Sequence, residues 1–108
     1  MVGVDLPLAD QTPIADCKLD LEGLRAQRER YRKLSAALEG TERATGVLTA
    51  RFSPAIDEEL LNRTLAIERE CCEFFRIDYD AADRMLTVRV DDPQLDPALD
   101  GLRHALTA

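Results

Sequence analysis

Two adjacent cysteines and a nearby glutamate form the densest group of reactive side chains in this sequence. They lie in the stretch LAIERECCEFF, which covers residues 65–75. Glu68 precedes Cys71 and Cys72 by three and four residues, which are the spacings at which side chains on one helix meet. A helix here would therefore bring one carboxylate and two sulfur donors together, a set that suits a soft metal ion.

The segment that carries this group has the pattern of an amphipathic helix. Over residues 57–75 most apolar side chains and both cysteines share one helical face, and most charged side chains lie outside it. Glu68 is the exception, because it falls within the apolar face. Burying an ionised carboxylate is costly unless it is paired or bound to a metal ion. We therefore expect Glu68 to be mostly buried and to contact Cys72 or an arginine of the preceding helix.

Two simpler interpretations of these residues stay open. Cysteine is among the most buried residue types, so an adjacent pair on an apolar face is often only part of a core. Glu68 could also form a structural ion pair with Arg25 or Arg28 of the preceding predicted helix.

The position of the cysteines argues against thiol–disulfide exchange. Cys71 and Cys72 occupy the last turn of the predicted helix, where the helix dipole disfavours a negatively charged thiolate. The sequence contains no Cys-x-x-Cys motif, and a disulfide between adjacent cysteines would close a strained ring. We therefore expect both cysteines to be reduced thiols.

Cys17 is the third candidate sulfur ligand. Residues 13–19 have weak strand character, and alternation places Cys17 on the face that we expect to lie under the helices. A shared metal ion requires its sulfur to lie within about 4 Å of a sulfur of Cys71 or Cys72, because metal–sulfur bonds are about 2.3 Å long. Three sulfurs would suit mercury or arsenite, or zinc if a fourth ligand or a water completes a tetrahedron.

The remaining segments predict a single α+β domain over residues 13–108, preceded by a flexible arm over residues 1–12. The expected elements are a strand at 13–19, a helix at 21–40 capped by Asp20 and ended by Gly40, a hairpin at 41–53 turning near Thr45 and Gly46, a helix from Ser53 to about Phe74, a hairpin at 75–90 and a helix at 96–107. The order β-α-β-β-α-β-β-α predicts a two-layer sandwich, with a mainly antiparallel sheet of four or five strands and three helices on one face. The other face of the sheet is left for solvent or for a second copy of the chain.

Composition narrows the range of functions. The net charge of -7 disfavours nucleic acid as a partner, because such a surface repels phosphates. No apolar run approaches the roughly 18 residues of a membrane span, and the first residues lack the pattern of a signal peptide. We therefore expect a cytoplasmic protein with no membrane partner, in a compartment that keeps thiols reduced.

The cysteine motifs resemble those of a family of small bacterial proteins. In that family an early Cys-x-Leu is followed by Glu-Arg-x-Cys-Cys-Pro-Phe-Phe on a helix and then by a strand hairpin. The matching positions, within residues 14–105, are Cys17, Leu19, Glu68, Arg69, Cys71, Cys72, Phe74 and Phe75. The resemblance implies an accessory role in heavy-metal resistance of the mercury or arsenic type. Glu73 replaces the family's proline, so we expect the helix to continue a little further here.

These observations lead to three functional hypotheses. The first is a non-enzymatic accessory protein that binds a soft metal ion (mercury, arsenite or zinc) through Cys17, Cys71 and Cys72, with Glu68 as a weak ligand or an orienting acceptor. The second is a cytoplasmic homodimeric interaction module with structural cysteines. The third is an enzyme that, like organomercurial lyases, uses two thiols and Glu68 as a proton donor to cleave carbon–mercury bonds.

Overall fold

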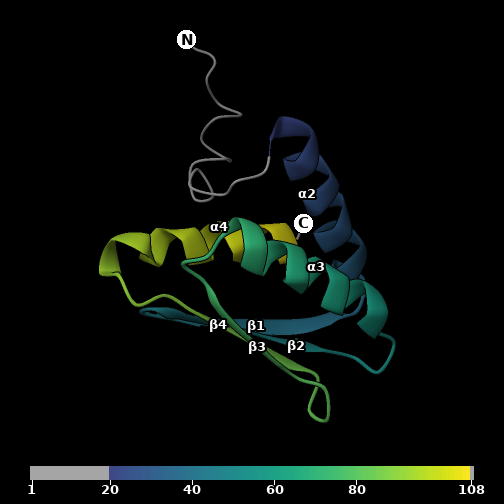
Figure 1. Ribbon diagram of the computed structural model, residues 1–108. Coiled ribbons are helices and arrows are strands. Elements are labelled where there is room, and N and C mark those ends of the chain that lie inside the picture. Colours follow the sequence, from purple (N-terminus) through teal and green to yellow (C-terminus); the bar gives the residue numbers. More distant parts are fainter. Residues whose placement is uncertain (1–19, 108) are drawn as a thin grey trace.

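The computed structural model describes residues 20–107 and has the predicted α+β architecture (Figure 1). Its elements are α2 (Leu21–Ser35), β1 (Leu38–Ala44), β2 (Val47–Phe52), α3 (Glu58–Cys71), β3 (Arg76–Asp80), β4 (Met85–Arg89), a short 3-10 helix η2 (Pro93–Leu95) and α4 (Asp96–Thr107). The four strands form one antiparallel sheet in the order β1-β2-β4-β3. The predicted arm at residues 1–12 and the predicted strand at residues 13–19 lie outside the described residues.

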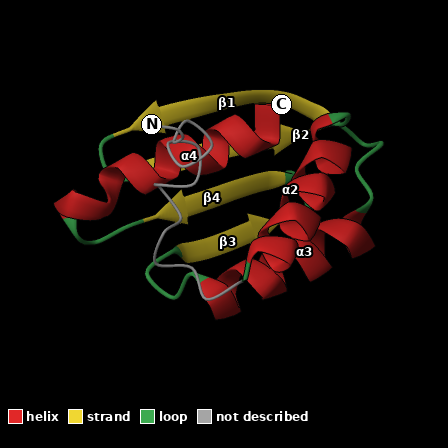
Figure 2. Cartoon of the chain, turned by 90° about the horizontal axis from the view of Figure 1, so that it is seen from above, coloured by secondary structure: helices red, strands yellow, loops and turns green. Residues whose placement is uncertain are grey.

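The three long helices cover one face of the sheet (Figures 1 and 2). Helix α4 packs on β1 and β2, α3 packs on β3, and α2 packs against both of these helices. The core lies between the two layers because alternate side chains of β2 and β4 face the helices and are buried: Leu48, Ala50, Phe52, Leu86 and Val88. The other face of the sheet carries mainly threonine and charged side chains, among them Thr49, Arg51, Thr87 and Arg89.

The strand alternation correctly predicts both hairpins. Ala44 pairs with Val47, so Thr45 and Gly46 form the turn between β1 and β2 as expected. The last helix also has the predicted bounds, and its stripe of Leu99, Leu102 and Leu106 is buried.

The first helix is shorter than predicted. Asp20 is its N-cap as expected, because its Oδ1 accepts a hydrogen bond of 2.7 Å from the backbone N–H of Gly23. The helix nevertheless ends at Ser35 rather than at Gly40. Leu38 is already paired with Phe52 in the sheet, so hydrogen bonds to β2 replace a further helical turn, and Gly40 lies within β1.

The bounds of the second predicted helix are also wrong at both ends. Helix α3 is capped by Asp57, whose Oδ1 accepts from the backbone N–H of Leu60 at 3.0 Å, whereas Ser53 forms a separate turn before it. The helix ends at Cys71, so it does not continue further despite Glu73. A hydrogen bond of 3.1 Å from the N–H of Phe75 to the carbonyl of Cys72 instead closes a turn after the helix. Phe75 is buried just before β3 begins.

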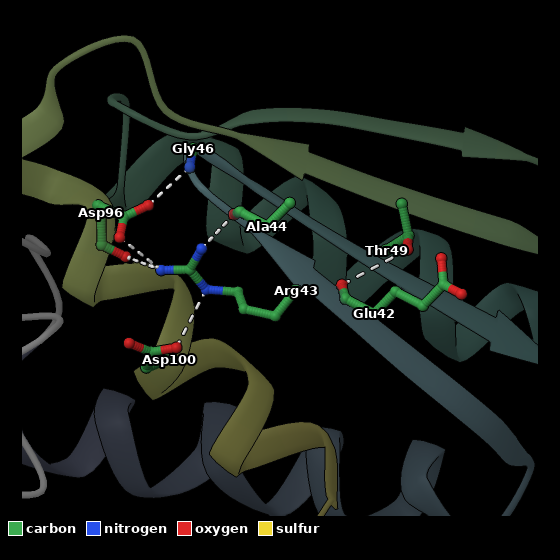
Figure 3. Close-up of polar contacts among 7 residues, drawn as sticks. All are labelled: Glu42, Arg43, Ala44, Gly46, Thr49, Asp96 and Asp100. Atoms are coloured by element: carbon green, nitrogen blue, oxygen red, sulfur yellow. Dashed lines mark hydrogen bonds and ion pairs between the residues drawn. The ribbon is translucent and has the colours of Figure 1, made fainter.

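A polar cluster fixes the β1–β2 turn to the start of α4 (Figure 3). The Arg43 guanidinium lies between Asp96 and Asp100, with N···O distances of 2.8 and 3.0 Å. The other carboxylate oxygen of Asp96 accepts a hydrogen bond of 2.6 Å from the backbone N–H of Gly46. The bond from Arg43, followed by the one from Gly46, lowers the pKa of Asp96 below its ordinary value. Gly46 adopts a φ of +76°, which side-chain-bearing residues rarely adopt.

Two glycine substitutions test this arrangement. We expect Gly46→Ala to lower the free energy of unfolding by about 1–3 kcal/mol, because alanine is strained at a positive φ. Gly40→Ala is the matched control, since an added Cβ at this strand position has no atom within 4 Å. Its effect should stay within about 0.5 kcal/mol. Urea denaturation of both variants measures the difference, and equal effects would show that the turn conformation is unimportant.

Candidate functional site

Glu68 is a buried carboxylate in the last turns of α3. It is only 3% exposed, and Leu61 and Leu65 on the same helical face are fully buried. The burial predicted from the helical pattern is therefore confirmed. A carboxylate in such a place needs hydrogen-bond donors or a cation.

The donors to Glu68 come from two successive turns of α2. Its Oε1 accepts one hydrogen bond from the Gln27 amide at 3.0 Å and another from the Tyr31 hydroxyl at 2.7 Å. Both donors are neutral and buried. Within residues 20–107 Glu68 forms no ion pair with Arg25 or Arg28, which are exposed, so that simpler interpretation is wrong.

Gln27 links the two helices at more than one point. Its Nε2 also donates to the backbone carbonyl of Thr64 at 3.0 Å, and its Oε1 accepts from Arg30 at 2.7 Å. The amide is therefore held at both ends, and its orientation is fixed by its partners. This places a donor against Glu68 in a defined position.

Tyr31 remains a hydrogen-bond donor over the whole physiological range. Removal of its hydroxyl from water raises its pKa well above the ordinary value, and the nearby charge of Glu68 acts in the same direction. A neutral phenol next to a carboxylate donates its proton into the hydrogen bond.

The two cysteines lie beside this buried carboxylate. Cys71 is 4% exposed and Cys72 is fully buried. Their Sγ atoms lie 3.6 Å apart, far beyond the disulfide bond length of about 2.05 Å, so the two are not bonded to each other. One carboxylate oxygen of Glu68 and the two Sγ atoms all lie within 4.8 Å of one another.

Three of the four predicted ligands therefore converge, and the fourth stays a prediction. Cys17 lies outside the described residues, so its distance from Cys71 and Cys72 is an expectation. Gln27 and Tyr31 were not anticipated as partners of Glu68. Their spacing of four residues on α2, which matches the spacing of Thr64 and Glu68 on α3, is the pattern that could have suggested them.

Comparison with known proteins adds no assignment to this site. The chain matches no protein-family model, no curated protein and no solved structure. The resemblance to the heavy-metal-resistance family therefore stays a prediction. No helix within residues 20–107 is long and apolar enough to cross a membrane.

The hydrogen bond from Tyr31 to Glu68 can be tested by deleting one hydroxyl group. We expect Tyr31→Phe to lower the free energy of unfolding by about 1–3 kcal/mol, because a buried acceptor loses a donor. Tyr79→Phe is the matched control, since its hydroxyl bonds to Glu58 at 2.8 Å in a half-buried position. Its cost should be smaller, below about 1 kcal/mol. Urea denaturation compares the two, and a larger loss with Tyr79→Phe would contradict the proposed importance of the buried bond.

Tyrosine ionisation provides an independent measurement. The chain has two tyrosines and no tryptophan, so tyrosinate absorbance is easy to assign. Burial raises the pKa of Tyr79 to about 12 and that of Tyr31 well above its ordinary value, whereas tyrosines in an unfolded chain ionise near pH 10. The stability that these raised pKa values reflect is fully present below about pH 10. It decreases as the pH rises further, because only the unfolded chain then releases the protons.

We therefore expect the folded protein to show little tyrosinate absorbance at pH 10 and the protein in guanidinium to be half ionised there. The Tyr79→Phe variant isolates Tyr31. Ionisation of Tyr31 near pH 10 in that folded variant would show that its hydroxyl is not buried against Glu68.

Proposed function

We propose that this protein is a non-enzymatic binding protein for a soft, thiophilic metal ion. Cys71 and Cys72 would supply thiolates, Cys17 a third, and Glu68 an oxygen ligand or an orienting acceptor. The observation that carries the proposal is a buried carboxylate whose oxygen lies within 4.8 Å of two buried thiols. An accessory role in heavy-metal resistance and a cytoplasmic location belong to the same proposal.

The hydrogen bonds of Glu68 support a ligand more than a purely structural role. Both donors, Gln27 and Tyr31, serve Oε1. Among the described residues no hydrogen-bond donor reaches Oε2, although the side chain is buried. A buried acceptor without a donor is uncommon and points to an additional partner, which a metal ion would provide.

A metal ion would also change the state of the thiols. Cys71 and Cys72 lie at the negative end of the α3 dipole and close to Glu68. Both of these features disfavour a negatively charged thiolate. A soft metal ion replaces the thiol protons when it binds, and its positive charge is favourable in the same place. Thiolate ligands select thiophilic ions and zinc over magnesium or calcium.

The two alternative functions receive less support from the structure. An enzyme that acts on an organomercurial must admit a substrate to its thiols, yet Cys71 and Cys72 are buried. A homodimer through the open sheet face would have to cover exposed arginines such as Arg51 and Arg89. Both hypotheses stay predictions without a specific observation in their favour.

Titration of the reduced protein with cadmium in the presence of a competing chelator tests the proposal. We expect one tight equivalent with a thiolate charge-transfer absorption, and an affinity that falls as the pH decreases because protons compete for the thiols. Cys71→Ala/Cys72→Ala should abolish this binding, and the isosteric Glu68→Gln should weaken it. Circular dichroism checks that each variant is folded. Unchanged binding by the folded double variant would return these cysteines to a purely structural role.

A further inference from the structure

The separation of the two sulfur atoms defines the angle at which they can share an ion. The Sγ atoms of Cys71 and Cys72 lie 3.6 Å apart. With the zinc–sulfur bond length of about 2.3 Å, this separation corresponds to an S–metal–S angle of about 103°. A tetrahedral complex needs about 3.8 Å, a trigonal planar one about 4.0 Å and a linear one about 4.6 Å. The pair is therefore arranged for a tetrahedral or pyramidal ion.

The backbone and the core hold the sulfurs at this separation. Cys71 is the last residue of α3, and Cys72 caps the helix with a φ of −126° and a ψ of 74°. The N–H of Cys72 donates to the carbonyl of Glu68 at 2.8 Å, which fixes the backbone between the two thiols. Both side chains belong to the hydrophobic core, where packing restricts rotamers. Opening the pair by the roughly 1 Å that a linear complex requires would displace neighbouring core side chains.

Glu68 makes the site less suitable still for a linear ion. A two-coordinate ion has no place for a third ligand, whereas zinc accepts carboxylate oxygen beside thiolate sulfur. Gln27 and Tyr31 hold the carboxylate next to the thiols through hydrogen bonds to its Oε1. The spacing of the two sulfur atoms and the carboxylate oxygen of Glu68 thus both favour a bent complex over a linear one.

We infer that the folded site selects ions that hold two thiolates at a bent angle and discriminates against ions that prefer a linear bis-thiolate. This inference rests on the proposed metal-binding function. The favoured class contains zinc and cadmium, and the disfavoured class contains silver, copper(I) and two-coordinate mercury(II). The angle also suits trivalent arsenic: the two thiols would replace two hydroxyl groups of arsenous acid, two water molecules would leave, and the arsenic would stay trivalent.

Thermal unfolding of the whole, reduced chain can measure this selectivity, because the unfolded chain carries the same cysteines without a fixed separation. An ion that binds the folded state more tightly than the unfolded state raises the unfolding midpoint, and the opposite preference lowers it. We expect one equivalent of cadmium to raise the midpoint and one equivalent of silver to leave it unchanged or lower it. The ratio of folded-state to unfolded-state affinity should be at least tenfold greater for cadmium than for silver.

The outcomes separate the inference from the function on which it rests. A ratio for silver that comes within tenfold of the cadmium ratio, or exceeds it, overturns the selectivity and leaves metal binding intact. If cadmium does not raise the midpoint, the selectivity inference fails, and the proposed function fails as well only if titration of the folded protein detects no bound cadmium. Cys71→Ala/Cys72→Ala, compared with its own ion-free midpoint, is the control. A cadmium shift that persists in this variant would place the ion elsewhere and overturn both.

Discussion

The burial of the Glu68 carboxylate is the constraint on which the packing of the helical layer depends. An uncompensated charge in the core would be strongly destabilising, so the donors to Glu68 must be present in the folded state. They come from Gln27 and Tyr31, which lie 41 and 37 residues earlier in the chain. Sliding α2 by one turn along α3 would remove both donors, at a cost of several kcal/mol. The carboxylate therefore fixes the register between these helices as well as their contact.

This register also determines where the thiols lie. Helix α3 is tied to β3 at both ends, because Tyr79 donates to Glu58 near its start and Arg69 donates to the carbonyl of Ile77 near its end. Between Cys71 and the first residue of β3 the chain has only four residues in which to turn. The two sulfur atoms are therefore held where helix α3 meets the edge strand β3, next to Glu68, whose hydrogen bonds join α3 to α2. Such a position is well defined in space, which is a requirement for a site that distinguishes ions by geometry.

The sequence predicted those features that depend on local periodicity. Both hairpins, the turn at Thr45 and Gly46, the last helix and the burial of Glu68 follow from alternation or helical phase, which neighbouring residues determine. The end of α2 could not be predicted in this way, because Gly40 resembles a helix stop and only the pairing of Leu38 with Phe52 shows that the strand begins earlier. The hydrogen-bond partners of Glu68 could not be predicted from the sequence for the same reason. Periodicity identifies which face of a helix is buried, but the contact of Gln27 and Tyr31 with Glu68 depends on how two helices are placed against each other.

The electrostatics of the site follow from the choice of neutral donors. Asp96 shows the alternative, since its carboxylate is paired directly with Arg43. Within the described residues Glu68 has no such cation, and apolar side chains of similar size at positions 27, 31 and 68 could fill the same space without any charge. The carboxyl group of Glu68, which is bonded only to neutral donors among the described residues, and the negative end of α3 together make this part of the interior more favourable for positive than for negative charge. In the proposed metal site, the features that disfavour a free thiolate at Cys71 and Cys72 would be the ones that favour a bound cation.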